Sequence, residues 1–526
     1  MTASVHPRHR ERILFAAILV LALAVRLWDL RARSLWFDEA GEYWVSTAPF
    51  AHLAQSVRTG TGDPPLYEFL LHAWMRVSHA EAWLRLLSVI ASVSGVAAVM
   101  ILARLLGGSL AALCAGLLLA LLPADIRYAQ EVGQYGLVPA AVAWNLVCLV
   151  MMTREKNWSR LFAWVLTALA ASYLYYATIF PVAAAFACVV LESVVRRDIR
   201  LRRATGTALV LYILGMLPLL ISYLPTQLSR VVESGGVTVP STDQPLGILD
   251  MLQMKWNYLG QLIAFQFTGW PHTHIPSGVV VIPAVVLVIL AARQSARLVA
   301  WLVVALAGYA VAAIAGVFPM GYRWGLILTP LIICAIATGL AATTATRARW
   351  ATIAAFVLLV GASVYSLPNR SLRDRVYRDE TGAWPETEDM RVVAQYWMQH
   401  RSPGQPTYVY YGAAPAFAYY TRETVPRAAL ASTWCLACWH DREPPAFCRD
   451  ANIYYGRWLR RLDTNEKLAS MVATLGGAPE SFWMVFGHMV PGDDRDMIAG
   501  FKREGYRVAA AIEGVNASAC LLTRAH

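Results

Sequence analysis

The sequence predicts a polytopic α-helical membrane protein with a C-terminal α/β domain. Of its 526 residues, 57% are hydrophobic and only 15% are charged, whereas a soluble domain has roughly 25% charged residues. Long apolar runs continue to residue 367, after which the composition changes to Asp, Glu, Arg, Pro and Tyr. We therefore expect a transmembrane domain over residues 1–367 and a second domain over residues 368–526.

The apolar runs define the expected membrane spans. A hydrocarbon core about 30 Å thick requires roughly 20 apolar residues per helix. By that rule we expect about eleven spans, at residues 13–30, 86–104, 109–123, 135–152, 161–177, 179–195, 206–224, 277–292, 299–317, 325–345 and 351–367.

Basic residues in the short loops predict the orientation. Loops rich in Arg and Lys stay in the cytoplasm because these residues resist translocation. Alternate loops carry them: Arg8, Arg10 and Arg12; Arg154, Lys156 and Arg160; Arg196, Arg197, Arg200, Arg202 and Arg203; Arg293 and Arg297; Arg347 and Arg349. We therefore expect a cytoplasmic N-terminus and a C-terminal domain on the far side. The net charge of +11 then reflects topology, and no nucleic-acid partner is expected.

Unusual polar residues gather in segments on the non-cytoplasmic side, at residues 31–85, 124–135, 225–275 and 318–324. A transporter would instead place ionisable groups at the middle of the membrane, often on broken helices and within internal repeats. The pattern therefore favours chemistry at the outer membrane surface.

The first of these segments opens with an acidic cluster in SLWFDEAGEYW, residues 34–44. An acid at the membrane surface can act as a general base, which makes Asp38 and Glu39 candidate catalytic residues. The structural alternative is a helix that starts at Glu39, with Asp38 as its N-cap and the other acids near the positive dipole end. Glu42, one turn later, is a candidate substrate-binding residue or a solvated acid on the same face.

Further candidate residues follow in TGDPPLYEFLLHAW, residues 61–74, where Asp63 and Tyr67 flank two prolines. From Leu66 this segment has the spacing of a helix lying along the membrane interface. The segment PADIRYAQEVGQYGL, residues 123–137, adds Arg127, Glu131 and Tyr135. Arg127 and Glu131 are also four residues apart, the spacing of an ion pair on a helix.

The segment PMGYRW, residues 319–324, places Tyr322 and Arg323 just before an apolar helix. An arginine at that depth requires an anion, and a guanidinium binds phosphate through paired hydrogen bonds. Contact with bulk lipid headgroups is the alternative. Together, a surface base and a phosphate-binding arginine predict sugar transfer from a polyprenyl phosphate to an acceptor hydroxyl.

These motifs also resemble a known family. SLWFDEA, DPPLYEFLLHAWMRV with WLRLLSVIASVSG, YAQEVGQYGL and YRWGLILTPLI occur in the order seen in the C-type membrane glycosyltransferase superfamily. The resemblance is to bacterial relatives of dolichyl-phosphate-mannose protein mannosyltransferases and of the lipid A aminoarabinose transferase. It implies the C-type glycosyltransferase fold and an inverting reaction.

The resemblance also implies roles for single residues. Asp38 matches the catalytic base and Glu39 the acid beside it. Asp63 and Tyr67 match a segment that usually reads His-Pro-Pro-Leu-Tyr, with Asp63 in place of the histidine. Glu131 and Tyr135 match a motif that usually reads Gln-Glu-Ala-Arg-x-Tyr.

Two positions depart from the family pattern. Gly133 replaces the arginine of the Gln-Glu-Ala-Arg-x-Tyr motif, so a phosphate or sugar contact would have to come from another residue such as Arg127. Arg323 matches an Arg-Tyr pair at the start of a late helix, and Trp324 replaces its tyrosine.

The expected activity is thus a polyprenyl-phosphate-sugar-dependent glycosyltransferase, hexosyl or pentosyl, in the bacterial inner membrane with its site on the periplasmic face. The expected partners are the donor, a glycan, lipid or protein acceptor, and membrane lipids. No cofactor is assigned, and a divalent cation held by the clustered acids stays open. The alternative function is an envelope lipid or polysaccharide transporter, or a noncatalytic envelope-binding protein.

The C-terminal domain is expected to shape the acceptor side, with strands at 406–412 and 481–488 and helices at 386–400 and 495–506. An even number of cysteines in an oxidising compartment predicts two disulfides. The candidates are Cys435, Cys438, Cys448 and Cys520. The alternative is a zinc site formed by Cys435, Cys438, His440 and Cys448. His272 and His274 are only two ligands, and two ligands alone do not form a metal site.

Overall fold

The computed structural model describes residues 7–47, 51, 64–233, 260–269, 275–315, 318, 322–367, 388–422, 449–450, 452–456, 463–489 and 492–525. The chain forms two compact units. The membrane unit comprises residues 1–28, 57–67 and 85–368, and the second unit comprises residues 29–56, 68–84 and 369–526. Most of the first loop, including the acidic cluster, thus folds with the C-terminal residues.

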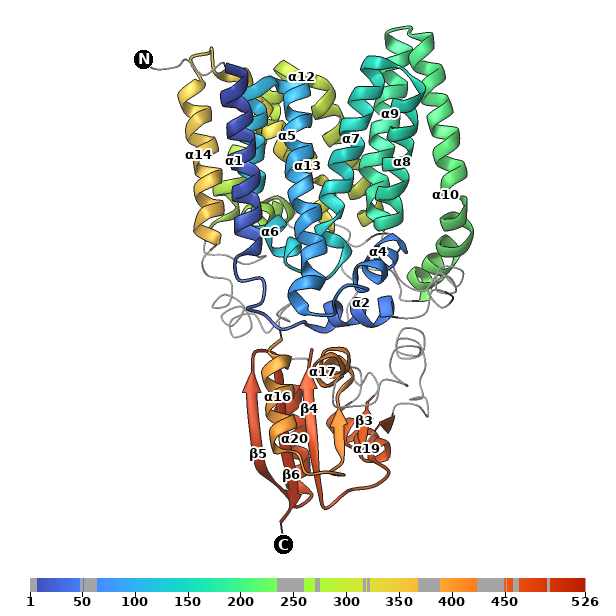
Figure 1. Ribbon diagram of the computed structural model, residues 1–526, viewed down its shortest axis with the longest axis vertical. Helices are drawn as coiled ribbons and strands as arrows, with labels where there is room; N and C mark the ends of the chain where they lie inside the picture. The colour runs from blue at the N-terminus through green and yellow to red at the C-terminus, as the bar shows by residue number, and fades with distance from the viewer. Residues whose placement is uncertain are drawn as a thin grey trace. The chain divides into compact units, whose positions relative to one another are not determined.

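The membrane unit is helical (Figure 1). Its long helices are α1 (Pro7–Leu27), α5 (Glu81–Ala120), α7 (Val138–Glu155), α8 (Trp158–Leu174), α9 (Ile179–Val195), α10 (Ile199–Glu233), α12 (Ser277–Ile314), α13 (Thr329–Thr343) and α14 (Arg349–Ser366). Shorter segments are α6 (Pro123–Ala129) and the 3-10 turns η1 (Gln134–Gly136), η2 (Tyr176–Thr178) and η3 (Arg323–Leu328).

Each predicted span overlaps a helix of the described residues, but the number of spans is not confirmed. Seven helices among the described residues are long and apolar enough to cross a membrane. Two of these, α5 and α12, have non-helical backbone at Gly108 and Ser295, between segments predicted as separate spans. The segments α1 and α8 are helical but fall outside the seven. The chain is therefore a multi-pass membrane protein, as predicted.

Helix α13 lies in the core of the membrane unit. Its residues from Thr329 to Leu340 are all buried. Gly339 allows close approach to α12, because a Cβ atom there would lie 1.9 Å from the Leu287 carbonyl oxygen. The 3-10 turn η3, which begins at Arg323, leads directly into this buried helix. Close packing therefore fixes the segment that carries Arg323.

The C-terminal part of the second unit is an α/β fold (Figure 1). By its contacts this unit also includes the first-loop helix α2 (Phe37–Thr47) and most of α4 (Leu66–Trp74). Its sheet has the order β2-β3-β1-β4-β6-β5. The strands are β1 (Thr407–Val409), β2 (Arg449–Asp450), β3 (Ile453–Tyr455), β4 (Ser481–Gly487), β5 (Tyr506–Gly514) and β6 (Ala517–Arg524). The helical segments are α16 (Met390–His400), η4 (Tyr411–Ala413), α17 (Ala414–Thr421), α19 (Thr464–Leu475) and α20 (Asp493–Arg503).

This sheet is mixed. Strand β1 pairs in parallel with β3 and β4, whereas β6 pairs antiparallel with both β4 and β5. Its core includes Tyr408, Met484, Phe486 and Phe501. The predicted α/β class is confirmed, and the four predicted elements appear as β1, β4, α16 and α20. The hairpin β5–β6 and helices α17 and α19 were not predicted.

The disulfide prediction is not supported. Cys520, in the middle of β6, is a free thiol packed in the core of the sheet. Burial raises the pKa of this thiol to about 12, so Cys520 behaves as a small apolar side chain rather than a reactive one. The other three candidates, Cys435, Cys438 and Cys448, lie outside the described residues.

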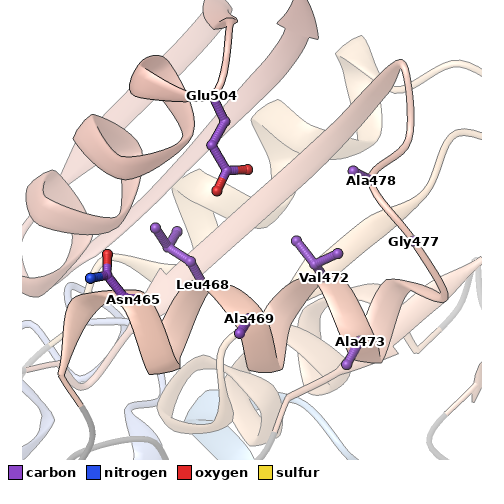
Figure 2. A pocket seen from close by; sticks show the side chains of 8 residues that line it. All are labelled: Asn465, Leu468, Ala469, Val472, Ala473, Gly477, Ala478 and Glu504. Atoms are coloured by element: carbon purple, nitrogen blue, oxygen red, sulfur yellow. The ribbon is translucent and has the colours of Figure 1, made fainter.

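A cavity of about 640 Å³ lies along α19. Figure 2 shows Asn465, Leu468 and Val472 of that helix beside Glu504, which follows α20. The remaining lining residues are small and mostly apolar: Ala469, Ala473, Gly477 and Ala478. None of the predicted site residues lines this cavity, so it is not the candidate active site.

Candidate active site

The acidic cluster lies on helix α2. The helix begins at Phe37, so Asp38 and Glu39 are both in its first turn, near the positive end of the helix dipole. The alternative in which Asp38 caps a helix starting at Glu39 is wrong, because the helix starts two residues earlier and Trp36 precedes it. The expected position of these acids near the positive end of the helix dipole remains.

Helix periodicity separates Asp38 and Glu42 from the packed face of α2. At about 100° per residue, Asp38 and Glu42 lie on one side of the helix, and Phe37 and Trp44 on another. Burial follows this division, since Phe37 and Trp44 are buried while Asp38 and Glu42 are half-buried. Glu39 is only 2% exposed. Asp38 is therefore better placed than Glu39 to meet a substrate.

The packed face of α2 contacts the C-terminal part of the second unit. The Phe37 ring stacks on His488 with 4.8 Å between centroids and lies 5.7 Å from Tyr411. The indole N–H of Trp44 donates a hydrogen bond to the Pro415 carbonyl oxygen at 2.9 Å. The helix that carries the acids is thus anchored by residues far away in the sequence.

Arg391 of α16 joins two parts of the first loop. Its Nε donates to the Glu81 Oε1 atom at 3.1 Å, and its Nη2 donates to the Arg33 carbonyl oxygen at 2.9 Å. Nearby, the Leu35 backbone N–H donates to the Tyr420 hydroxyl at 2.6 Å. These bonds hold the extended residues that lead into α2.

The membrane unit collects the residues predicted to bind the donor. Arg127 lies on α6, and its Nη1 donates to the Gly269 carbonyl oxygen at 2.9 Å. Its Nε lies 3.9 Å from the Glu131 Oε1 atom, so the helical ion pair is present at long range. Both side chains are buried, at 5% and 6% exposure.

Arg323 and Tyr322 belong to the same group of side chains. The Arg323 guanidinium carbon lies 5.2 Å from the Tyr135 ring centroid and 5.6 Å from that of Trp324. Tyr135 in turn lies 5.6 Å from Tyr128.

Tyr322 links this group to the segment that carries Gln261 and Phe265. Its hydroxyl donates to the Gln261 Oε1 atom at 2.9 Å, and its ring lies 5.4 Å from Phe265. Phe265 and Tyr128 are packed together in one cluster, with Tyr135 and Tyr322 against it. We call Arg127, Tyr128, Glu131, Tyr135, Phe265, Tyr322 and Arg323 the aromatic–arginine cluster.

A buried ion pair that the sequence reasoning missed supports this cluster. The Arg26 Nη2 atom lies 2.5 Å from the Asp125 Oδ2 atom, and the two residues are 0% and 3% exposed. Arg26 Nε also donates to the Ser92 hydroxyl at 2.7 Å, and Gln130 Nε2 donates to the Arg26 carbonyl oxygen at 2.9 Å. Two features of the sequence could have indicated this pair: Arg26 near the end of the first apolar run, and Asp125 shortly after Pro123.

Only some of the remaining predicted site residues lie in the part of the chain that the structure describes. Tyr67 is buried in the first turn of α4, whereas Asp63, His272 and His274 lie outside the described residues. Over the described ranges, no group of three or more His, Cys, Asp or Glu side chains could hold a metal ion.

Comparison with known proteins found structural matches only; no family model and no curated protein matches the chain. ArnT from Cupriavidus metallidurans is 14% identical and covers 97% of each chain, with a TM-score of 0.44 in the apo state and 0.42 bound to undecaprenyl phosphate. The archaeal oligosaccharyltransferase AglB from Archaeoglobus fulgidus, in complex with an inhibitory peptide and a dolichol-phosphate, is 10% identical. It has a TM-score of 0.45 and covers 98% of this chain and 74% of that chain.

ArnT is the lipid A aminoarabinose transferase, one of the proteins that the motifs resemble. The structural comparison thus returns one of the proteins that the motifs resemble. What the residues of this chain can do follows from their own chemistry: one unit offers guanidinium and aromatic groups, and the other offers half-buried carboxylates on an anchored helix.

Proposed function

We propose that this protein is an inverting glycosyltransferase that moves a sugar from a polyprenyl-phosphate donor to an acceptor hydroxyl. The observation that carries the proposal is the aromatic–arginine cluster of the membrane unit. Arg127 lies over the Tyr128 ring and Arg323 over the Tyr135 ring, and the two rings are 5.6 Å apart. The cluster thus joins the segment 123–137 to a segment that is far away in the sequence.

The cluster has the chemistry that a lipid-linked phosphate requires. Two guanidinium groups provide charge-assisted donors for phosphate oxygens, and such bonds are shorter and stronger than neutral ones. The aromatic rings provide apolar walls for a sugar or for the first isoprene units. Arg323 is half-buried at the start of η3, so it combines partial desolvation with access to a ligand.

Asp38 supplies the base. Its carboxylate lies in the first turn of α2, on the half-buried side of that helix, and can accept a proton from an acceptor hydroxyl. In the proposed reaction Asp38 takes the proton of the acceptor hydroxyl, and the acceptor oxygen forms a bond to the anomeric carbon. The bond between that carbon and the phosphate oxygen breaks, and polyprenyl phosphate leaves with the electron pair. Attack from the face opposite the leaving group inverts the anomeric configuration.

The transporter alternative has less support. Charged side chains of the described helices lie near helix ends or kinks: Arg26 in the last turn of α1, Glu192 near the end of α9, and Arg297 beside the kink in α12. A transporter would place such groups at the centre of the membrane.

We place the reaction on the periplasmic face of a bacterial inner membrane. The basic loops assign the opposite face to the cytoplasm. The periplasm lacks nucleotide sugars, so a lipid-linked donor is the expected substrate.

The test is turnover by the purified full-length protein in lipid nanodiscs. Hexosyl and pentosyl polyprenyl phosphates are supplied with envelope lipids and glycans as acceptors, and release of polyprenyl phosphate is measured by mass spectrometry. We expect release with at least one donor, and release about 100- to 10,000-fold slower with Asp38→Asn. Turnover of a nucleotide sugar without any lipid carrier would overturn the proposal.

A metal requirement is measured in the same assay by adding a chelator. Activity that survives the chelator would exclude a divalent cation held by the acids of α2. Loss of activity that returns with added cation would assign one to them.

A further inference from the structure

A buried acid–histidine pair packs against the start of helix α2. Glu388 Oε1 is 3.0 Å from His488 Nδ1, and the Glu388 side chain is fully buried. The two residues are far apart in the sequence and meet only in the folded second unit. Burying a carboxylate costs free energy that one hydrogen bond rarely offsets, so a pair of this kind is weak as a stabilising device.

The histidine of this pair contacts the residues that precede and begin α2. Its ring stacks on Phe37 with 4.8 Å between centroids and an interplanar angle of 13°, and it lies 5.9 Å from the Trp36 ring. Phe37 is the residue directly before Asp38. His488 thus packs against the residues at which the first turn of α2 begins.

The backbone around His488 is held in an unusual conformation. His488 has a φ of +52°, a left-handed value that few residues other than glycine adopt. Gly412 packs against this position, because a Cβ atom on Gly412 would lie 2.5 Å from the Gly487 carbonyl oxygen and 2.8 Å from the His488 Cβ atom. Strained and over-determined positions of this sort cluster at functional sites.

Charge couples the pair to Asp38 as well. Burial raises the pKa of Glu388, and the hydrogen bond and charge of His488 act against that rise, as does the Phe37 backbone N–H. The negative charge of Asp38 raises the pKa of Glu388 further. The buried pair therefore interacts with the first turn of α2 through both ring stacking and charge.

We propose that Glu388 and His488 are positioning residues that fix the first turn of α2 and thereby orient Asp38. This rests on the proposed function of Asp38 as the base, but the positioning itself can be measured without any activity. It also gives the C-terminal residues a part in the chemistry, beyond shaping the acceptor side.

The test compares His488→Phe, Glu388→Gln and the control His400→Phe in the full-length protein in nanodiscs. Phenylalanine keeps a ring against Phe37 but cannot bind Glu388, and glutamine keeps the shape of Glu388 but removes its charge. His400 is a matched control, because it also stacks on an aromatic ring, that of Tyr396 at 3.9 Å, and is exposed on α16. Two properties are measured: hydrogen exchange of the amides of residues 36–44, and kcat and donor KM.

We expect faster exchange in residues 36–44 for both pair variants and none of this change for His400→Phe. We expect kcat to fall by about 10- to 100-fold, the size expected when a reacting group is misplaced, with donor KM unchanged. Equal exchange in the variants and wild type would overturn the positioning role, and so would faster exchange spread evenly over the whole second unit. If the wild type transfers no sugar, the proposed function fails, and the exchange data still decide whether the pair fixes α2.

Discussion

The two units of this protein carry opposite chemistry. The membrane unit gathers guanidinium groups and aromatic rings around Tyr128 and Phe265, whereas the second unit presents carboxylates on one side of α2. Under the proposed function, the difference is a division of labour, in which one unit binds the anionic donor and the other activates the neutral acceptor.

The units also hold their functional segments differently. In the membrane unit, the pair of Arg26 and Asp125 is almost fully buried. In the second unit, the corresponding link between Arg391 and Glu81 is partly open to solvent, with side chains 29% and 14% exposed. The same ionic chemistry therefore has different consequences, since a lost partner is costly only where water cannot replace it.

The largest expected effect concerns the base. Asp38→Asn keeps the size of the side chain but cannot accept the proton, so kcat should fall by about 100- to 10,000-fold. The thermal unfolding temperature should stay unchanged. The measurement is polyprenyl-phosphate release under saturating donor, with Asp463→Asn, which changes the aspartate at the start of α19, as the control. A well-folded Asp38→Asn protein with wild-type turnover would remove Asp38 from the mechanism.

The next effect distinguishes the two ion pairs. Asp125→Asn leaves Arg26 buried without its counter-charge and should lower the free energy of unfolding by about 3–5 kcal/mol. Glu81→Gln should cost only about 0–1 kcal/mol, because solvent reaches Arg391. Denaturant-induced unfolding in detergent micelles measures both. Equal losses in the two variants would contradict the distinction between the buried and the partly exposed pair.

A smaller effect is expected for phosphate binding. Arg323→Ala removes a charge-assisted donor worth about 1.5–3 kcal/mol, which corresponds to a rise in donor KM of roughly 10- to 150-fold. Arg349→Ala is a matched control, because Arg349 lies 5.2 Å from the Trp350 ring much as Arg323 lies 5.6 Å from Trp324. An unchanged donor KM in Arg323→Ala would assign that arginine to bulk lipid headgroups instead.

The smallest effect is on the pH dependence of stability. Burial raises the pKa of Glu388 above its ordinary value of 4.5, so the folded state holds more protons than the unfolded state between the two values. Stability is therefore highest below the ordinary pKa and falls as the pH rises through the raised one. Glu388→Gln should remove this decline. A decline of the same steepness in the variant would show that another group causes it.

The sequence by itself determined the membrane class, the approximate positions of the apolar helices and the segments that carry the candidate site residues. Apolar runs and basic loops report directly on a bilayer, and the motifs around Asp38, Glu131 and Arg323 are local in the chain. The free thiol of Cys520 shows the limit of such reasoning, because an even cysteine count says nothing about which side chains point into a core.

Only the tertiary structure decided which residues meet. Arg26 and Asp125 are 99 positions apart, and Glu388 and His488 are 100 apart, so no local pattern links them. The assignment of α2 to the second unit depends on Phe37 and Trp44 packing against residues beyond position 400. Such contacts arise from burial of whole faces, a property of the folded chain that no single segment encodes.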